Sequence, residues 1–327
     1  MNDFYMKKAS EEHHISRNPG MALDMSLIDK IKINKSAVER RASTLGTRRA
    51  VKKEWQAAWL LRAITCIDLT TLAGDDTDGN VSRLCAKARK PVREDILASL
   101  GMEPITVGAV CVYHNLIPAA LKTLEGSGIP VAVVSTGFPA GQITSEQKIK
   151  EIETSVAAGA KEIDIVISRA MVLTGNWEAL YEEVKAYRKA CGDAHLKTIL
   201  ATGELATLTN VAKASQICMM GGADFIKTST GKESVNATLP VSLVMVRAIR
   251  DYYERTGFKV GFKPAGGISK AKDAITWLIL IKEELGNEWL NNHLFRFGAS
   301  SLLGDIERQL EHFTTGRYSA SYRHPVA

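Results

Sequence analysis

Two lysines lie in short apolar runs of the kind that form buried β-strands. Lys227 lies in FIKTST, Lys263 lies in GFKPAG, and Asp164 lies between isoleucines in EIDIVIS. A lysine attacks a carbonyl carbon only as the neutral amine, and its ordinary pKa near 10.4 leaves almost none at pH 7. Burial and a second ammonium group both lower that pKa. The pair therefore indicates a Schiff-base nucleophile and its electrostatic partner.

A carboxylate near such an imine would complete the chemistry. The protonated imine withdraws electrons, so a neighbouring C–C or C–H bond breaks, and Asp164 can carry the proton directly or through water. Asp68, in CIDLT, is a fourth charge on a predicted strand. A purely structural network of buried ion pairs also accounts for one Asp–Lys pair, but it gives little reason for two lysines on neighbouring strands. We expect class I aldolase chemistry with no metal and no cofactor.

Two glycine-containing segments follow the last two strand-like runs, and they predict a phosphate site. Their sequences are AGGIS (265–269) and GASSLL (298–303). Barrels often bind phosphate in these two positions, where backbone N–H groups beside glycine can approach the phosphate oxygens. A tight turn would explain a single glycine pair, but not both segments. The candidate phosphate-binding residues are Gly231, Lys232, Gly266, Gly267, Ser269, Gly298, Ser300 and Ser301.

Strand-like and helix-like runs alternate from about residue 64 to residue 313. The strand-like runs start about 24 to 42 residues apart, which is the size of a βαβ unit. Eight such units predict an α/β fold, specifically a (β/α)8 TIM barrel with an N-terminal helical extension, whose active site lies at the carboxyl ends of the strands. The runs span 64–70, 106–113, 130–138, 162–168, 195–201, 225–230, 261–266 and 295–300.

This pattern divides the chain into four parts. We expect a disordered arm over residues 1–22, a helical extension over 23–60, the catalytic barrel over 61–315 and a C-terminal tail over 316–327. An apolar stripe around Trp55 and Trp59 is expected to cover one end of the barrel.

Composition limits the function classes. The chain has 327 residues, 45% of them apolar, with 42 Lys and Arg against 36 Asp and Glu. This excludes disorder for most of the chain, and no uninterrupted apolar run is long enough to span a membrane. The basic excess lies almost wholly in residues 1–60, which lack a dense basic cluster with aromatics. Nucleic acid is therefore not required as a partner, although protein or RNA contacts through this region stay open.

The cysteines and histidines indicate a compartment but no metal site. Five widely spaced cysteines without a C-x-x-C pair form no recognisable disulfide framework, and the seven histidines show no metal-ligand spacing. No apolar signal-peptide core is present near the N-terminus. We expect a cytoplasmic protein, and the sequence leaves the nucleus open as an additional location.

Six segments, in order between residues 60 and 315, resemble deoxyribose-phosphate aldolase. This resemblance implies a TIM barrel that reversibly cleaves 2-deoxy-D-ribose 5-phosphate to D-glyceraldehyde 3-phosphate and acetaldehyde. The N-terminal helices, including residues 51–72, are similar to those of animal members. The segments are IDLTTL (67–72), AVCVY (109–113), GFPAG (137–141), EIDIVI (162–167), DFIKTSTGK (224–232) and GFKPAGGI (261–268).

The resemblance also implies roles for individual residues. Lys227 would form the Schiff base, Lys263 would lower its pKa, and Asp164 would relay the proton with a water molecule. The acetaldehyde end of the pocket would be lined by Asp68, Thr70 and Cys111, and the phosphate would be held by Gly266, Gly267, Ser300 and Ser301. This sequence departs from the family at His114 and Asn115, where Pro and Arg are usual, and at Ser269, where Arg is usual.

A second reading is a barrel that has become a binding or scaffold protein through its basic arm. The intact set of Lys227, Lys263 and Asp164 argues against lost catalysis, because buried charges that do no work are costly. Sugar phosphate and aldehyde are the expected partners. A homodimer and the role of Tyr318 and Tyr322 in the tail are left open by the sequence.

Overall fold

The barrel consists of eight parallel strands in the order β7-β6-β5-β4-β3-β2-β1-β8. The structure is a computed structural model that describes residues 16–325. Isolated bridges from Phe262 to Phe295 and from Ala265 to Gly298 close the sheet between β7 and β8. The strands are β1 (Ile67–Thr70), β2 (Ala109–Val112), β3 (Val131–Ser135), β4 (Glu162–Val166), β5 (His195–Ile199), β6 (Phe225–Lys227), β7 (Gly261–Lys263) and β8 (Phe297–Ala299). The predicted TIM barrel is confirmed.

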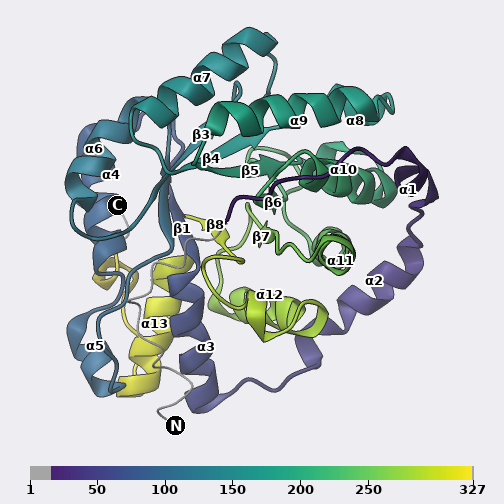
Figure 1. The fold of residues 1–327 in the computed structure, drawn as a ribbon. Coiled ribbons are helices and arrows are strands. Elements are labelled where there is room, and N and C mark those ends of the chain that lie inside the picture. Colours follow the sequence, from purple (N-terminus) through teal and green to yellow (C-terminus); the bar gives the residue numbers. More distant parts are fainter. Residues whose placement is uncertain (1–15, 326–327) are drawn as a thin grey trace.

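Helices surround the strands (Figure 1). They are α4 (Asp78–Arg89), α5 (Glu94–Ser99), α6 (Ile117–Leu124), α7 (Ser145–Ala157), α8 (Arg169–Leu173), α9 (Trp177–Cys191), α10 (Leu208–Met220), α11 (Leu239–Thr256), α12 (Ala271–Glu284) and α13 (Leu302–Thr315). Short 3-10 turns are η3 (His114–Leu116), η4 (Thr202–Glu204) and η5 (Asn287–Trp289). The start of α7 illustrates a local sequence cause: Thr144 and Gln147 form a capping box that satisfies free N–H groups.

Period-2 alternation separates an outer core from the barrel interior. On β4 and just beyond it, Ile163, Ile165 and Ile167 belong to the large cluster packed between strands and helices. A second, small cluster of Ala109, Cys111, Ala132 and Val134 lies on the other face of β2 and β3. Because successive side chains of a strand point to opposite faces, residues between the outward isoleucines point inward.

Strand register places the charged side chains side by side. Lys227 on β6 is the direct partner of Lys263 on β7. Asp164 on β4 is the direct partner of Lys197 on β5. Parallel neighbours in a sheet lie about 4.8 Å apart, so the register alone brings these groups into one cluster.

An N-terminal extension runs around the outside of the barrel before β1. It consists of α1 (Met25–Lys30), α2 (Lys35–Ser43), η2 (Leu45–Thr47) and α3 (Lys53–Thr65). These elements contact, in turn, α10, α11, α12 and α13. Figure 1 shows the same path in purple, from α1 through α2 to α3. The extension therefore follows four successive outer helices.

The expected disordered arm differs from the structure at residues 16–22; residues 1–15 lie outside the described part. Asn18 is 1% exposed. Its side chain donates to the carbonyl oxygens of Met219 and Ala223 and accepts from the Tyr252 hydroxyl, and its N–H donates to Asp224. Gly20 follows with φ +69°, and a Cβ there would lie 2.4 Å from the Met220 carbonyl oxygen. Docking onto α10 and α11 is what orders this segment.

The expected packing is wrong for Trp55, whereas Trp59 packs in part against the main hydrophobic cluster. Trp55 is 66% exposed, and Trp59 is only half-buried. The buried face of α3 is instead Ala57, Leu60, Leu61 and Ile64, and it packs against α12 and α13 at the side of the barrel. The smaller and aliphatic side chains of α3 are the buried ones, because they fit the groove between α12 and α13.

The C-terminal tail folds back onto α13. After η6 (Ser321–Arg323), His324 is 4% exposed and lies 2.6 Å from the Glu311 carboxylate. Tyr318 and Tyr322 are both strongly exposed, and residues 326–327 lie outside the described part.

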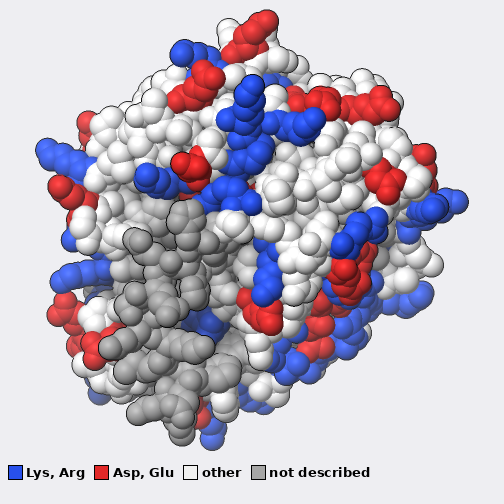
Figure 2. All heavy atoms as spheres, viewed as in Figure 1, with Lys and Arg blue, Asp and Glu red and all other residues white. Residues whose placement is uncertain are grey.

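Surface charge is mixed on the face shown in Figure 2, where Lys and Arg are interspersed with Asp and Glu. Within residues 16–325, no helix combines the length and the hydropathy that a membrane span needs.

Candidate active site

Seven charged side chains meet inside the barrel, and each is at least 97% buried. The acids come from β1 and β4, and the bases come from β5, β6, β7 and the residue before β8. They are Asp68, Glu162, Asp164, Lys197, Lys227, Lys263 and Arg296. With all seven ionised the cluster carries one net positive charge, so its cost depends on close mutual pairing.

Asp164 is the centre of this cluster. Its Oδ2 accepts from Lys227 Nζ at 2.8 Å and from Lys263 Nζ at 2.8 Å. Its Oδ1 accepts from Lys197 Nζ at 3.1 Å. One carboxylate oxygen thus holds both of the sequence-predicted lysines, and the inward orientation expected for Asp164 places it between them.

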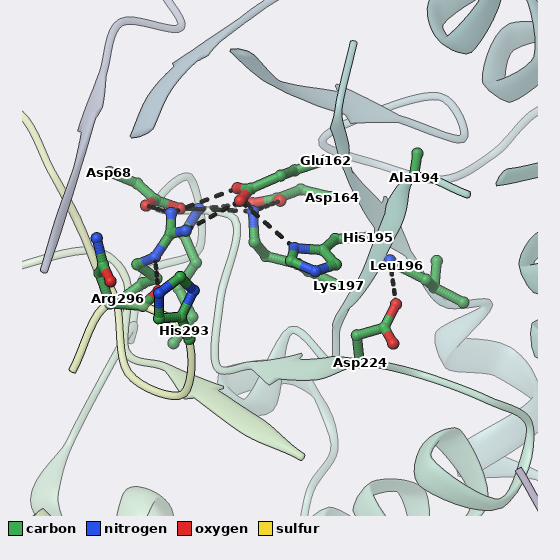
Figure 3. Close-up of polar contacts among 12 residues, drawn as sticks. Asp68, Glu162, Asp164, Ala194, His195, Leu196, Lys197, Asp224, His293 and Arg296 are labelled. Carbon is green, nitrogen blue, oxygen red and sulfur yellow. Dashed lines mark hydrogen bonds and ion pairs between the residues drawn. The ribbon is translucent and has the colours of Figure 1, made fainter. Parts of the chain in front are cut away.

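Asp68, Glu162 and Arg296 continue the charged cluster beside Asp164 (Figure 3). Arg296 donates to Asp68 Oδ1 at 2.5 Å and to Glu162 Oε1 at 2.9 Å. Asp68 Oδ2 accepts from Lys263 Nζ at 2.5 Å, and Lys197 bonds to Glu162. A continuous chain of charged hydrogen bonds therefore joins Arg296 to Lys227 through Asp68, Lys263 and Asp164.

The pKa values separate the three lysines. Burial lowers the pKa of Lys227, and the charge of Lys263 lowers it further, while Asp164 only partly opposes this. Burial also opposes the charge of Lys263, but Asp164 and Asp68 outweigh it and raise the pKa of Lys263. In the same way Asp164 and Glu162 raise the pKa of Lys197 against burial. Lys227 is the lysine that most readily becomes a neutral amine.

Asp164 and Asp68, which both contact Lys263, stay ionised. Burial raises the pKa of Asp164, but Lys197, Lys227 and Lys263 together hold it well below its ordinary value. Burial is likewise outweighed at Asp68, where Lys263, Arg296 and Lys197 lower the pKa. A carboxylate that stays negative keeps Lys263 protonated beside Lys227, which is the condition for lowering the pKa of Lys227.

A cavity of about 410 Å³ opens at the carboxyl ends of the strands, and Lys227 lines it. Ten of the sequence-predicted residues line this cavity: Thr70, Lys227, Gly231, Lys232, Gly266, Gly267, Ser269, Gly298, Ser300 and Ser301. Asp68, Asp164 and Lys263 lie in the charged cluster beneath Lys227. The cavity volume is that of a small-molecule site.

Glycine is required at two points of this cavity. Gly298 lies against Lys263, and a Cβ there would come within 2.8 Å of the Ala265 Cβ and 3.2 Å of the Lys263 Cε. Gly267 has φ +81° with open space where a Cβ would point, so its backbone is exposed to a ligand in a conformation that L side chains rarely adopt. Ser301 caps α13 without a side-chain hydrogen bond, which leaves N–H groups of that helix available to an anion.

The Gly231 N–H is already engaged. The buried carboxylate of Glu233 accepts from the N–H groups of Thr230 and Gly231 and from the Thr230 hydroxyl. These bonds shape the loop after β6. Gly231 therefore borders the cavity, but its N–H is directed at Glu233.

Of the three residues expected at the aldehyde end, Asp68 lies in the charged cluster, and the other two take different positions. Thr70 lines the cavity and donates its hydroxyl hydrogen to the Asp68 carbonyl oxygen. Cys111 is fully buried in the inner apolar cluster, and burial raises the pKa of its thiol. That thiol stays protonated, so it acts as a small apolar wall and not as a nucleophile.

Sequence reasoning missed Glu162, Lys197 and Arg296. A signal was present, because Glu162 precedes Asp164 by two residues and Lys197 is two residues beyond His195, the spacing of one strand face. Arg296 in FRFGAS lies between two buried phenylalanines, Phe295 and Phe297. An alternating charge between apolar neighbours is the same pattern that identified Asp164.

The two departures from the family pattern lie apart from the charged cluster. His114 Nδ1 is 3.5 Å from the Glu151 carboxylate, on the loop side of β2. Ser269 lines the cavity, so a hydroxyl stands where the family usually has a guanidinium. Among residues 16–325, no group of three His, Cys, Asp or Glu side chains is placed to hold a metal ion.

The fold and the site define a class of protein. Residues 62–292 match the family model described as DeoC/LacD family aldolase, and this chain belongs to that family. A crystal structure of a putative deoxyribose-phosphate aldolase from Toxoplasma gondii matches with a TM-score of 0.70 at 20% identity. The matched region covers 82% of this chain and 99% of the Toxoplasma gondii chain. At that identity the likeness shows the fold.

Particular relatives are much closer in sequence. The chain is 61% identical over 316 residues to a protein of Homo sapiens named deoxyribose-phosphate aldolase, covering 95% of this chain and 99% of the relative. It is 53% identical over 251 residues to a putative deoxyribose-phosphate aldolase of Caenorhabditis elegans, covering 76% and 80%. The predicted family is confirmed.

Proposed function

We propose that this chain is an aldehyde-lyase that reversibly cleaves 2-deoxy-D-ribose 5-phosphate to D-glyceraldehyde 3-phosphate and acetaldehyde. The close relatives that carry the name deoxyribose-phosphate aldolase support this activity. The observation that carries the proposal is Lys227: it lines the cavity, and it is the cluster's lysine whose pKa is lowered.

Catalysis begins with attack of the neutral Lys227 Nζ on C1 of the open-chain aldehyde, and loss of water then gives a protonated imine. The C2–C3 bond breaks as its electron pair moves toward the imine nitrogen, and the C3 hydroxyl loses its proton to become the aldehyde of glyceraldehyde 3-phosphate. The remaining enamine takes a proton at C2. Water then hydrolyses the imine, which releases acetaldehyde and the free lysine.

Asp164 and Lys263 have different tasks in this scheme. Asp164, acting with a water molecule, moves the proton between the C3 hydroxyl and C2. Lys263 stays protonated and lowers the pKa of Lys227. Support comes from the geometry, because both ammonium groups contact the same Asp164 oxygen.

The phosphate lies at the far end of the cavity. Gly266, Gly267 and Gly298 allow close approach of the backbone, and Ser269, Ser300 and Ser301 supply hydroxyls. Lys232, which lines the same cavity, adds a positive charge. The open N-terminus of α13 supports this placement, since helix N-termini bind anions.

The mechanism needs neither a metal nor a cofactor, because the protonated imine is the electron sink. We assign catalysis to residues 61–315 and regard residues 23–60 as an extension packed on the barrel. The five cysteines are all buried and free, which fits a reducing compartment such as the cytoplasm. A scaffold protein that had lost its chemistry would have no use for seven buried charges.

Borohydride reduction tests the proposal. The full chain is incubated with 2-deoxy-D-ribose 5-phosphate, reduced, digested and mapped by mass spectrometry. We expect a stable adduct on Lys227, with acetaldehyde and glyceraldehyde 3-phosphate formed in equal amounts before reduction. An adduct on Lys263 would reverse the assignment of the two lysines, and turnover without any adduct would overturn the mechanism.

A further inference from the structure

A second cavity lies outside the active site, between the N-terminal extension and α12. Its volume is about 610 Å³, larger than that of the active-site cavity. Trp55, Trp59 and Arg62 of α3 form one wall, and Lys282 of α12 lies in another. Ser269, just before α12, lines the active-site cavity, whereas Lys282 lies near the other end of this helix. At 1.5 Å per residue, the two ends of α12 are about 20 Å apart.

Four cations line this cavity, and three of them have no acidic partner among the described residues. Its lining includes Arg48, Arg49, Arg62 and Lys282, and no described acidic residue. Glu283 neutralises Arg49 at 2.6 Å. The other three cations have only neutral acceptors: Arg48 donates to the Thr44 hydroxyl, Arg62 to the Leu290 carbonyl oxygen, and Lys282 to the Asn287 side chain. Among the ion pairs of residues 16–325, none involves these three.

Two indole rings border the same cavity. Trp55 is 66% exposed, whereas Trp177, Trp277 and Trp289 are at most 8% exposed. An exposed tryptophan in a concave, cationic site offers a flat face on which a planar ring can stack. Three unpaired cations beside it suit a phosphate group. The cavity therefore offers the two contacts that a phosphorylated nucleobase needs, and its volume lies in the range of small-molecule sites.

We propose that this cavity binds a phosphorylated nucleobase, with the base stacked on Trp55 and the phosphate held by Arg48, Arg62 and Lys282. Most of the lining, from Arg48 to Trp59, precedes the family match at residues 62–292. The site is thus built by the extension on a helix of the barrel, and it is separate from the aldolase reaction.

Other occupants fit less well. A membrane surface meets a convex apolar face, but this feature is concave and its rim is cationic. A symmetric second copy would bring the same patch against itself, and a patch lined by cations without acids would repel its own copy. A phosphorylated ring compound satisfies both the charge and the shape.

Binding is tested on the full chain with adenosine 5′-monophosphate as the probe, by equilibrium dialysis and by tryptophan fluorescence. Because the other three tryptophans are buried, quenching reports on Trp55 and Trp59. We expect the monophosphate to bind more tightly than adenosine or ribose 5-phosphate. Trp55→Ala and Lys282→Ala should each weaken binding about tenfold, with the aldolase rate unchanged. A six-nucleotide single strand is tested in parallel. Comparing its affinity with that of the monophosphate shows whether the site takes a free nucleotide or a nucleotide within a nucleic-acid strand.

Matched variants locate the site. Lys272→Ala removes an exposed cation from the same helix, and Ser301→Ala alters the active-site cavity, so neither should change binding of the monophosphate. The proposal is overturned if ribose 5-phosphate binds as tightly as the monophosphate, or if Ser301→Ala weakens binding and Trp55→Ala does not. It is equally overturned if Trp55→Ala instead dissociates a dimer or abolishes binding to anionic vesicles while the nucleotide does not bind.

Discussion

The barrel interior and the cavity beside α3 both gather cations, but they hold them in opposite ways. Inside the barrel, Lys227 and Lys263 each lie 2.8 Å from an Asp164 oxygen, and Arg296 joins two carboxylates. Beside α3, Arg62 and Lys282 find only neutral oxygens. Buried charges must be paired where no solvent reaches them, whereas charges at a solvent-open cavity can stay free for a ligand. Pairing inside the barrel sets the pKa values of the charged groups there. Arg62 and Lys282 beside α3 have no acidic partner among the described residues, so they remain available to bind a ligand.

The largest expected effect is at the nucleophile. Lys227→Arg keeps a positive charge but removes the primary amine, so the imine cannot form. The rate of cleavage should fall at least about 10⁴-fold, and borohydride should trap no adduct. Circular dichroism serves as the folding control. Residual turnover near the wild-type rate would show that Lys227 is not the nucleophile. The paired cations inside the barrel would then not serve catalysis in the way proposed.

The second effect separates the two lysines by pH. Lys263→Leu removes the cation that lowers the pKa of Lys227, so that pKa rises toward its ordinary value. Each unit of rise lowers the neutral fraction about tenfold, and we expect a loss of about 100-fold at pH 7. The rising limb of kcat/KM against pH should move to higher pH. Lys272→Leu, exposed on α12, is the control, and an unmoved limb in Lys263→Leu would contradict the assigned role.

Arg296 tests whether the ion pairs with Asp68 and Glu162 stabilise the interior of the barrel. Arg296→Met leaves Asp68 and Glu162 without their shared partner, and the free energy of unfolding should fall by about 3–5 kcal/mol. Because the pKa of Asp68 is lowered in the folded chain, its contribution is complete above the unfolded pKa of about 3.9 and is lost as pH falls through the folded pKa. Wild-type stability should therefore decline below about pH 4, and Arg296→Met should show a smaller decline in denaturant melts.

A smaller effect is expected where the extension docks. Asn18→Ala removes three side-chain hydrogen bonds that link residue 18 to α10, α11 and the segment before β6. Stability should fall by about 2 kcal/mol, measured as a lower Tm with no change in kcat. Arg17→Ala, which loses one exposed bond to the Asp193 carbonyl oxygen, is the matched control and should stay within about 0.5 kcal/mol of wild type. Equal losses in both variants would contradict specific docking by Asn18.

No effect at all is expected from metal removal. Since the imine withdraws the electrons, dialysis against EDTA should leave the rate of aldol cleavage unchanged. Activity that disappears with EDTA and returns with zinc would place the chemistry in a different class.

The sequence predicted those site residues whose signal lies within a single strand, and it missed those whose position depends on contacts between distant segments. Lys227, Lys263 and Asp164 were predictable because a charge inside an apolar strand run is itself unusual. Lys197 and Arg296 show the same alternation, but only the register of neighbouring strands, which pairs Asp164 with Lys197 and brings β8 beside β1, shows that they join this cluster. Asn18 could not be found, since its partners lie more than 200 residues away along the chain. A polar residue beside Pro-Gly otherwise looks like part of a disordered arm.

The path of the extension also has a consequence for how the protein folds during synthesis. Residues 16–65 are synthesised before the helices that they contact, α10 to α13. The extension must wait undocked until most of the barrel exists, because domains are synthesised from the N-terminus at about 5–20 residues per second. The extension therefore docks last, on four helices that are all made after it.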